Sequence, residues 1–205
     1  MERTSNRPLS KGIKLFEKNG GLLRTSKALK EGLHPRTLYE MEREGLIVKL
    51  SRGLYRLSDR TEASRPDLLI AGSKIPQGVI CLISALSFHN LSTQIPREVW
   101  IALRQGMTRP RIDYPPIHLS WFSEESYAAG VDSHEIDGVE IKIFSPEKTI
   151  TDCFKFRNTI GLDVALEALK NWRKKAKAKN IEQLMKYAKI CRIEKIMKPY
   201  LEAIL

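Results

Sequence analysis

The chain has 205 residues, of which 42% are hydrophobic and 29% charged, as in ordinary globular proteins with a buried core. No apolar run approaches the roughly 18 residues of a membrane span, and the N-terminus lacks an apolar signal segment, so we expect a cytoplasmic protein without membrane contact. The cysteines, Cys81, Cys153 and Cys191, are odd in number and far apart, which argues against a disulfide framework or a zinc site. We expect no metal and no cofactor.

The formal net charge of +11 is concentrated at the two ends of the chain. Residues 1–60 carry 14 Lys and Arg against 7 Asp and Glu, and residues 151–205 carry 13 against 6. The middle, residues 61–150, carries 8 against 11. Two basic ends around a mildly acidic middle are typical of a polyanion binder, although solvated lysine faces also produce such charge.

The first two helices are each expected to end at a glycine. Ser10 is the expected N-cap of a first helix that ends at Gly20-Gly21. "LLRT" then predicts a short strand, and Thr25 is the expected cap of a second helix that ends at Gly32.

A third helix and a hairpin complete this region. "HPRTLYEMEREG" (34–45) predicts a helix with Pro35 at its first position, where the missing N–H would have no partner in any case. "LIVKL" and "LYRLS" then flank "SRG", which predicts a hairpin with glycine in its three-residue loop. This order predicts a winged helix-turn-helix domain over residues 1–60.

Residues 61–205 predict a mixed α/β domain that ends in a helical bundle, so the fold class is α+β. The polar "DRTEASRPD" (59–67) is the expected linker. "PQGVICLISALSFHNLS" predicts a buried helix, and "EVWIALR" and "IHLSWFS" predict strands. A hairpin is expected around Asp137-Gly138, and Ser145-Pro146 begins a helix through "EKTITDCFKFR". Three further helices are expected in "LDVALEALKNWRKKA", "NIEQLMKYAKIC" and "IEKIMKPYLEAIL".

The third helix is the candidate DNA-reading element. With Leu38 facing inward on a helical wheel, Met41 lies near it, and the opposite side carries Arg36, Tyr39, Glu40 and Arg43, with Thr37 at the edge. The N-terminal part of such a helix reaches base edges, and the arginine fork fits guanine. We therefore predict Arg36 as a base reader, with His34 and Thr37 beside it.

The remaining polar residues of this face are expected to contact the DNA backbone or to pair with one another. Tyr39 and Arg43 are expected to contact the DNA backbone. Glu40 either accepts from cytosine or pairs with Arg36 or Arg43. The hairpin adds Lys49, Arg52 and Arg56, with Arg52 at its tip, a charge suited to a minor groove or phosphates. The alternative is a solvated face on a protein-interaction adaptor; the basic hairpin favours DNA.

Three segments resemble the AbiEi-type antitoxins, which are transcriptional regulators of type IV toxin–antitoxin systems. They are "GGLLRTSKALKEGLHPRTLYEMEREGLIVKLSRGLYRLS", "GVICLISALSFHNLS" and "SPEKTITDCFKFRNTIGLDVALEAL", and together they extend the resemblance over about residues 10–175. The resemblance implies a repressor that binds inverted repeats of double-stranded DNA in its own promoter. It also implies a functional partner, a nucleotidyltransferase-like toxin, that is counteracted without a stable complex. The protein would bind its repeats as a dimer or as two monomers side by side.

Two further sets of residues are candidate sites in the second half. The basic stretch "KNWRKKAKAK" offers Arg173, Lys174, Lys175 and Lys177 as a second DNA contact, although a solvated helix end is an equal alternative. A second set, Lys148, Asp152, Lys155 and Arg157, is the candidate antitoxin surface if exposed. If these residues are buried against Ser84 or His89, their role is structural.

No enzyme is expected. Glu140 and Lys142 on a predicted strand resemble a nuclease motif, but the acidic residues nearby belong to the same hairpin. Glu140 and Lys142 are two residues apart, so they are more simply explained as neighbours on the exposed face of a strand. A DNA nuclease is therefore the least favoured alternative.

Overall fold

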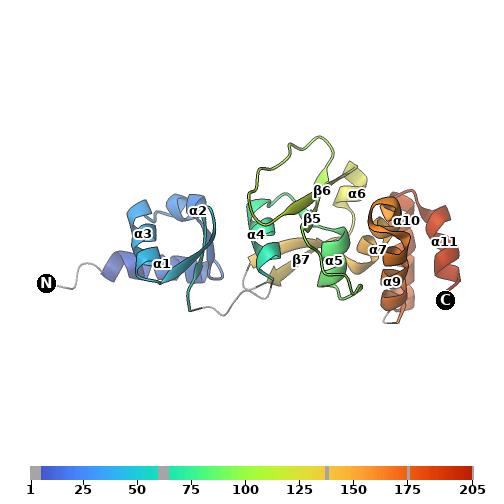
Figure 1. The fold of residues 1–205 in the computed structure, drawn as a ribbon, viewed down its shortest axis with the longest axis horizontal. Coiled ribbons are helices and arrows are strands. Elements are labelled where there is room, and N and C mark those ends of the chain that lie inside the picture. Colours follow the sequence, from blue (N-terminus) through green and yellow to red (C-terminus); the bar gives the residue numbers. More distant parts are fainter. Residues whose placement is uncertain (1–5, 60–64, 137–138, 175, 205) are drawn as a thin grey trace. The chain divides into compact units, whose positions relative to one another are not determined.

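The computed structural model describes residues 6–59, 65–136, 139–174 and 176–204 (Figure 1). Most of the expected linker, residues 60–64, and the expected turn residues Asp137 and Gly138 lie outside the described residues. Contacts divide the chain into two compact units, Met1–Lys74 with His134–Ile141, and Ile75–Ser133 with Lys142–Leu205. The fold is mixed α+β, as predicted.

The first unit contains helices around a small antiparallel sheet. Its elements are α1 (Asn6–Lys18), β1 (Leu22–Arg24), α2 (Thr25–Lys30), α3 (Pro35–Arg43), β2 (Ile47–Ser51), β3 (Leu54–Leu57) and α4 (Pro66–Lys74). The strands lie in the order β1-β3-β2, and both outer strands run antiparallel to β3. The predicted succession from the first helix to the hairpin is confirmed, whereas α4 was not predicted.

Two predicted helix starts in this unit are wrong. Helix α1 begins at Asn6, so Ser10 lies inside the helix. The early start is compatible with Pro8, because proline is tolerated in the first turn. Helix α2 has Arg24 in the N-cap position, with Thr25 as its first helical residue. Pro35 does occupy the first turn of α3, as predicted.

The core of the first unit places α1 closely against α3. Phe16 of α1 and Leu38 and Met41 of α3 are buried in one cluster with the strand residue Ile47. Gly12 makes the close approach of the two helices feasible, because a Cβ atom there would collide with the Met41 sulfur. Helix α3 therefore packs directly against α1.

The hairpin of β2 and β3 has a tighter turn than predicted. Ser51 pairs with Leu54, so Arg52 and Gly53 form the turn, and the register shifts between Lys49 and Ser51. Gly53 has a φ of 74°, a conformation that glycine adopts without steric cost. The Gly53 carbonyl accepts a 2.9 Å hydrogen bond from the backbone N–H of Thr25, which anchors the tip.

The second sheet is five-stranded and mixed. Its strands are β4 (Val79–Ile80), β5 (Val99–Arg104), β6 (Ile117–Phe122), β7 (Val131–Ile136) and β8 (Val139–Phe144), in the order β6-β5-β4-β8-β7. Strand β4 is antiparallel to β5 and parallel to β8, and β5 is parallel to β6. The strands predicted at β5 and β6 and the strands of the predicted hairpin, β7 and β8, are confirmed.

One predicted helix is wrong in its first half. The apolar run at residues 76–92 contains strand β4 followed by a shorter helix, α5 (Leu82–Phe88). A continuous apolar run carries no periodicity that separates a buried strand from a buried helix. Helix α6 (Glu124–Ala128) was also not predicted.

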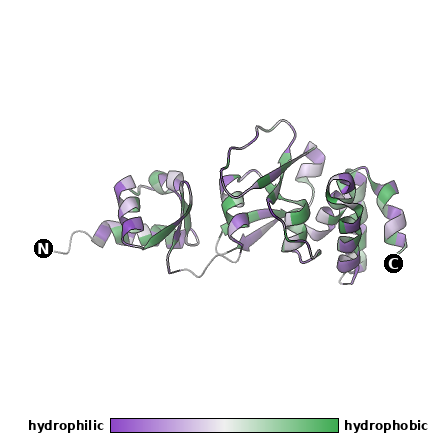
Figure 2. Ribbon diagram, in the orientation of Figure 1, coloured by the Kyte–Doolittle hydropathy of each residue, from purple (hydrophilic) through white to green (hydrophobic). Residues whose placement is uncertain are grey.

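The C-terminal helices surround α7, which begins at Pro146. They are α7 (Pro146–Lys155), α8 (Arg157–Ile160), α9 (Leu162–Arg173), α10 (Ala178–Ile190) and α11 (Glu194–Glu202). Helix α7 contacts α5, α9, α10 and α11. Green and purple segments alternate along α9 and α10, as expected for amphipathic helices (Figure 2). Ser145 accepts a hydrogen bond from the Lys148 N–H, which confirms the predicted cap. No helix in the described ranges is long and apolar enough to cross a bilayer.

Candidate functional site

Helix α3 turns one face into the core and leaves a cationic face uncovered. Leu38 and Met41 are buried, whereas Arg36 and Arg43 are exposed. Tyr39 lies between the two arginines in sequence, with 68% of its surface exposed. The guanidinium of Arg43 lies 3.1 Å from the carboxylate of Glu44, in an exposed ion pair. The structure thus brings three of the predicted DNA-contacting residues onto one accessible face.

Thr37 and His34, the other two residues predicted at the start of the reading helix, lie in different surroundings. Thr37 was placed at the edge of the exposed face, but it is 7% exposed because α1 packs on that side of the helix. His34 is the N-cap of α3, and its Nδ1 accepts a 3.2 Å hydrogen bond from the Arg36 N–H. Capping requires a neutral ring nitrogen, since a protonated Nδ1 cannot accept. His34 therefore positions the start of α3, beside the residue predicted to read bases.

Replacing His34 by alanine is expected to lower the free energy of unfolding by about 0.5–2 kcal/mol, the range for loss of a helix N-cap. The physical reason is an unpaired Arg36 N–H at the first turn. Urea unfolding at neutral pH measures the change. His34→Asn is the matched control, because asparagine also caps; equal losses in both variants would contradict the capping role.

The hairpin presents its cations unevenly. Lys49 and Arg52 are exposed, with Arg52 in the turn, while Arg56 is half-buried on β3. Glu40 is also half-buried. The two exposed cations keep the arrangement expected of a phosphate-contacting hairpin, whereas Arg56 is the least accessible of the three.

Sequence reasoning missed a row of cations on α1. Arg7, Lys11 and Lys14 line an open cleft of about 700 Å³ together with His34 and Thr37 of the α3 end. Their spacing of four and three residues places them on one helical face, a signal that was present in the sequence. All three side chains are exposed.

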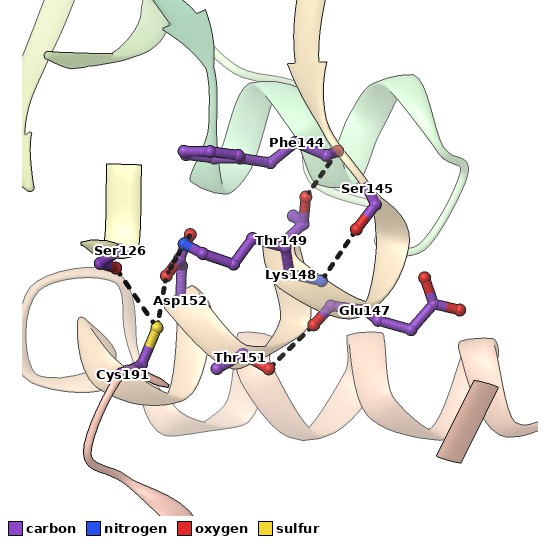
Figure 3. Close-up of polar contacts among 9 residues, drawn as sticks. All are labelled: Ser126, Phe144, Ser145, Glu147, Lys148, Thr149, Thr151, Asp152 and Cys191. Atoms are coloured by element: carbon purple, nitrogen blue, oxygen red, sulfur yellow. Dashed lines mark hydrogen bonds and ion pairs between the residues drawn. The ribbon is translucent and has the colours of Figure 1, made fainter. Parts of the chain in front are cut away.

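The candidate antitoxin set is split by the structure, because two of its members are fully buried. Lys148 and Asp152 have no exposed surface, and their ammonium and carboxylate groups are 2.5–2.6 Å apart (Figure 3). The Lys148 Nζ also lies 4.2 Å from the Phe144 ring centroid and 5.0 Å from that of Phe122. These two residues are therefore buried rather than on the surface, and their printed contacts are with Phe122, Phe144 and Cys191 rather than with Ser84 or His89.

Asp152 is the centre of a small buried polar group. Its Oδ1 lies 3.5 Å from Cys191 Sγ, which in turn lies 3.3 Å from Ser126 Oγ (Figure 3). Burial raises the pKa of the Asp152 carboxyl, and the charge of Lys148 opposes that rise. Burial, followed by the nearby Asp152 charge, raises the pKa of the thiols of Cys81, Cys153 and Cys191. These thiols remain protonated and are poor nucleophiles.

Glu147, next to Lys148, joins three helices. Its Oε1 accepts hydrogen bonds from Trp172 Nε1 of α9 at 3.1 Å and from Asn180 Nδ2 of α10 at 2.8 Å. The remaining members of the antitoxin set, Lys155 and Arg157, are half-buried. The α7 segment thus positions the C-terminal helices through buried polar contacts.

The C-terminal basic residues lie around a second, shallower cleft. Arg173 and Lys174 line a space of about 440 Å³ together with Glu167. The pKa of Glu167 is lowered by hydrogen bonds from Thr93 and Ser92, so a negative charge persists there. Lys177 is exposed, and Lys175 lies outside the described residues. This cleft therefore carries mixed charge, whereas the residues that line the cleft at α1 include no acidic side chain.

The nuclease-like pair has the alternation expected of an exposed strand face. Glu140 and Lys142 are exposed on β8, while Ile141 and Ile143 between and after them are buried. Within the described ranges, no group of three or more His, Cys, Asp or Glu side chains is placed to hold a metal ion.

The fold has a counterpart among solved bacterial structures. The crystal structure of the RV2827C protein from Mycobacterium tuberculosis matches with a TM-score of 0.55 and 11% sequence identity, covering 96% of this chain and 81% of that one. At this identity the likeness concerns the fold alone. No curated protein matches the sequence.

The N-terminal segment is similar to a family of regulators. Residues 13–58 match the family described as "Transcriptional regulator, AbiEi antitoxin". The matched segment contains α2, α3 and the whole hairpin. The resemblance to AbiEi antitoxins is thereby confirmed for this segment, and its extension toward residue 175 stays a prediction.

Proposed function

We propose that the protein is a DNA-binding transcriptional repressor whose residues 1–60 form a winged helix-turn-helix domain. The observation that carries the proposal is the accessible face of α3, where Arg36, Tyr39 and Arg43 lie together above a buried opposite face. The exposed Arg52 at the tip of the hairpin and the AbiEi match support it. In this arrangement α3 enters a major groove and the hairpin follows the adjacent backbone.

The proposal extends to an antitoxin role for residues 61–205. The protein would repress its own operon at inverted repeats, as a dimer or as two monomers side by side, and act in the cytoplasm. It would counteract a nucleotidyltransferase-like toxin without a stable complex, and it would not itself be an enzyme. Lys155 and Arg157 are the members of the antitoxin set that retain some exposure. The match to an antitoxin family supports this role.

The test is a gel-shift series with the gene's own upstream region and a random duplex of equal length. Preferential binding to the upstream region, weakened by salt, is the expected result. No binding to either duplex at 50 mM salt would overturn the proposal and favour a protein-interaction adaptor. Cleavage of the DNA in the presence of magnesium would instead favour a nuclease.

Replacing Arg52 by alanine is expected to weaken binding to operator and random DNA alike. The reason is that a phosphate contact carries no sequence information, and its loss lowers the salt slope by about 1. Binding isotherms at several salt concentrations measure both effects. Ser58→Ala, an exposed change outside the turn, is the control; a loss confined to the operator would contradict the backbone role.

A further inference from the structure

The cleft between α1 and the start of α3 has the chemistry of a phosphate site. Arg7, Lys11 and Lys14 lie at positions i, i+4 and i+7 of α1, so one helical face directs three cations into it. Its other lining residues are Pro8, Ser10, Gly32, Leu33, His34 and Thr37, none of them acidic. The site is therefore cationic without an internal counter-charge.

The cleft opens beside the residues proposed to read DNA. His34 and Thr37 belong to both the cleft and the first turns of α3. A Cβ atom at Gly32 would lie 3.8 Å from the Lys11 ammonium, so this cation reaches the turn between α2 and α3. The close packing of α1 on α3 at Gly12 and Met41 holds the two helices together within the first unit. A group bound in the cleft would therefore lie beside His34 and Thr37, at the start of α3.

Lys18, one turn further along α1, shows where this row of cations ends. Its ammonium lies 3.7 Å from the carboxylate of Glu31, and it does not line the cleft. Glu17 lies beside a neighbouring hollow that also contains Lys14. The positive charge is thus concentrated at the N-terminal half of α1, toward the start of α3.

We propose that Arg7, Lys11 and Lys14 bind backbone phosphates of the DNA strand that borders the major groove occupied by α3. The inference rests on the proposed DNA binding and adds α1 as a phosphate-binding element. DNA would then be contacted by three elements: α3, the hairpin that follows the C-terminal end of α3, and α1 at the N-terminal end of α3. Lysine and arginine bind phosphates through charge and hydrogen bonds and fix the register of a reading helix without reading sequence.

The test replaces Arg7, Lys11 and Lys14 together by glutamine and measures DNA affinity from 50 to 200 mM salt. Loss of three phosphate contacts lowers the salt slope by about 2.7. The variant's loss of DNA affinity relative to the unmodified protein should therefore shrink about 40-fold between 50 and 200 mM salt. Affinities for the upstream region and a random duplex fall in the same proportion. A charge-matched variant with glutamine at the exposed positions Lys186, Lys195 and Lys198 keeps the original slope.

The outcomes separate the two proposals. If the unmodified protein binds DNA but the α1 variant keeps its salt slope, this inference fails and the DNA-binding proposal stands. If the unmodified protein binds no DNA, the proposed function fails. Inorganic phosphate at constant ionic strength provides the other arm: if it stabilises the unmodified protein but not the α1 variant, while that variant keeps its salt slope on DNA, the cleft binds free phosphate and the backbone assignment is overturned.

Discussion

Replacing Lys148 by methionine is expected to lower the free energy of unfolding by about 3–5 kcal/mol, the largest effect of any single change considered for this chain. Lys148 and Asp152 are fully buried with their charged groups 2.5–2.6 Å apart. Methionine fills much of the space between Phe122 and Phe144, so the loss comes mainly from an uncompensated carboxylate. Denaturant unfolding at pH 7 measures it.

The double variant Lys148→Met/Asp152→Leu separates charge from packing. Removing both charges is often neutral, whereas removing one is costly, so we expect the double variant to recover most of the stability. Lys155→Met is the matched control on the same helix, half-buried and expected to cost less than about 1 kcal/mol. A double variant as unstable as the sum of its two single variants would show that the pair is not coupled.

The stability of Lys148→Met also has an expected pH dependence. Burial raises the pKa of Asp152, and removing Lys148 takes away the charge that opposes this rise. A carboxyl whose pKa is higher in the folded than in the unfolded state binds its proton more tightly when folded. The deficit of the variant is therefore smallest below about pH 4, the ordinary aspartate range, and grows as pH rises. A deficit independent of pH between 4 and 8 would contradict an ionised buried pair.

The burial of this pair could not be predicted from local spacing. A lysine and an aspartate at i and i+4 are the usual pattern of an exposed helical pair. What buries them is distant in sequence: Phe122 of β6, Phe144 of β8 and Cys191 after α10. The cap at Ser145-Pro146, by contrast, depends only on adjacent residues, and it was predicted.

The same division between local and distant causes applies to the first unit. The start of α3 at Pro35 and the hairpin with Gly53 are local features, and both were predicted. Thr37 was placed at the edge of the exposed face because a wheel shows only the angle of each residue. Its burial depends on α1, which packs on α3 where Gly12 removes a side chain. The cleft lined by α1 was missed for the same reason, although the spacing of its cations was visible.

Replacing Arg36 by alanine is expected to weaken binding to the upstream region by about 5- to 150-fold, equivalent to the 1–3 kcal/mol of one bidentate base contact. Arg36 is exposed at the first turn of α3, and the His34 cap holds that turn in place. A base contact acts only at the correct sequence, so affinity for a random duplex should remain almost unchanged. Competition gel shifts at one fixed salt concentration measure the ratio of the two affinities.

Two further variants make the Arg36 result specific. Arg36→Lys keeps the charge but loses the planar fork, so it should show most of the loss in operator preference. Arg43→Ala removes a cation from the other end of α3, where Glu44 already lies 3.1 Å away, and it should reduce both affinities slightly and equally. If Arg36→Ala lowers operator and random binding by the same factor, or if Arg36→Lys restores full preference, Arg36 acts as a phosphate contact. The reading role would then belong to another residue of the exposed face, for which Tyr39 is the next candidate.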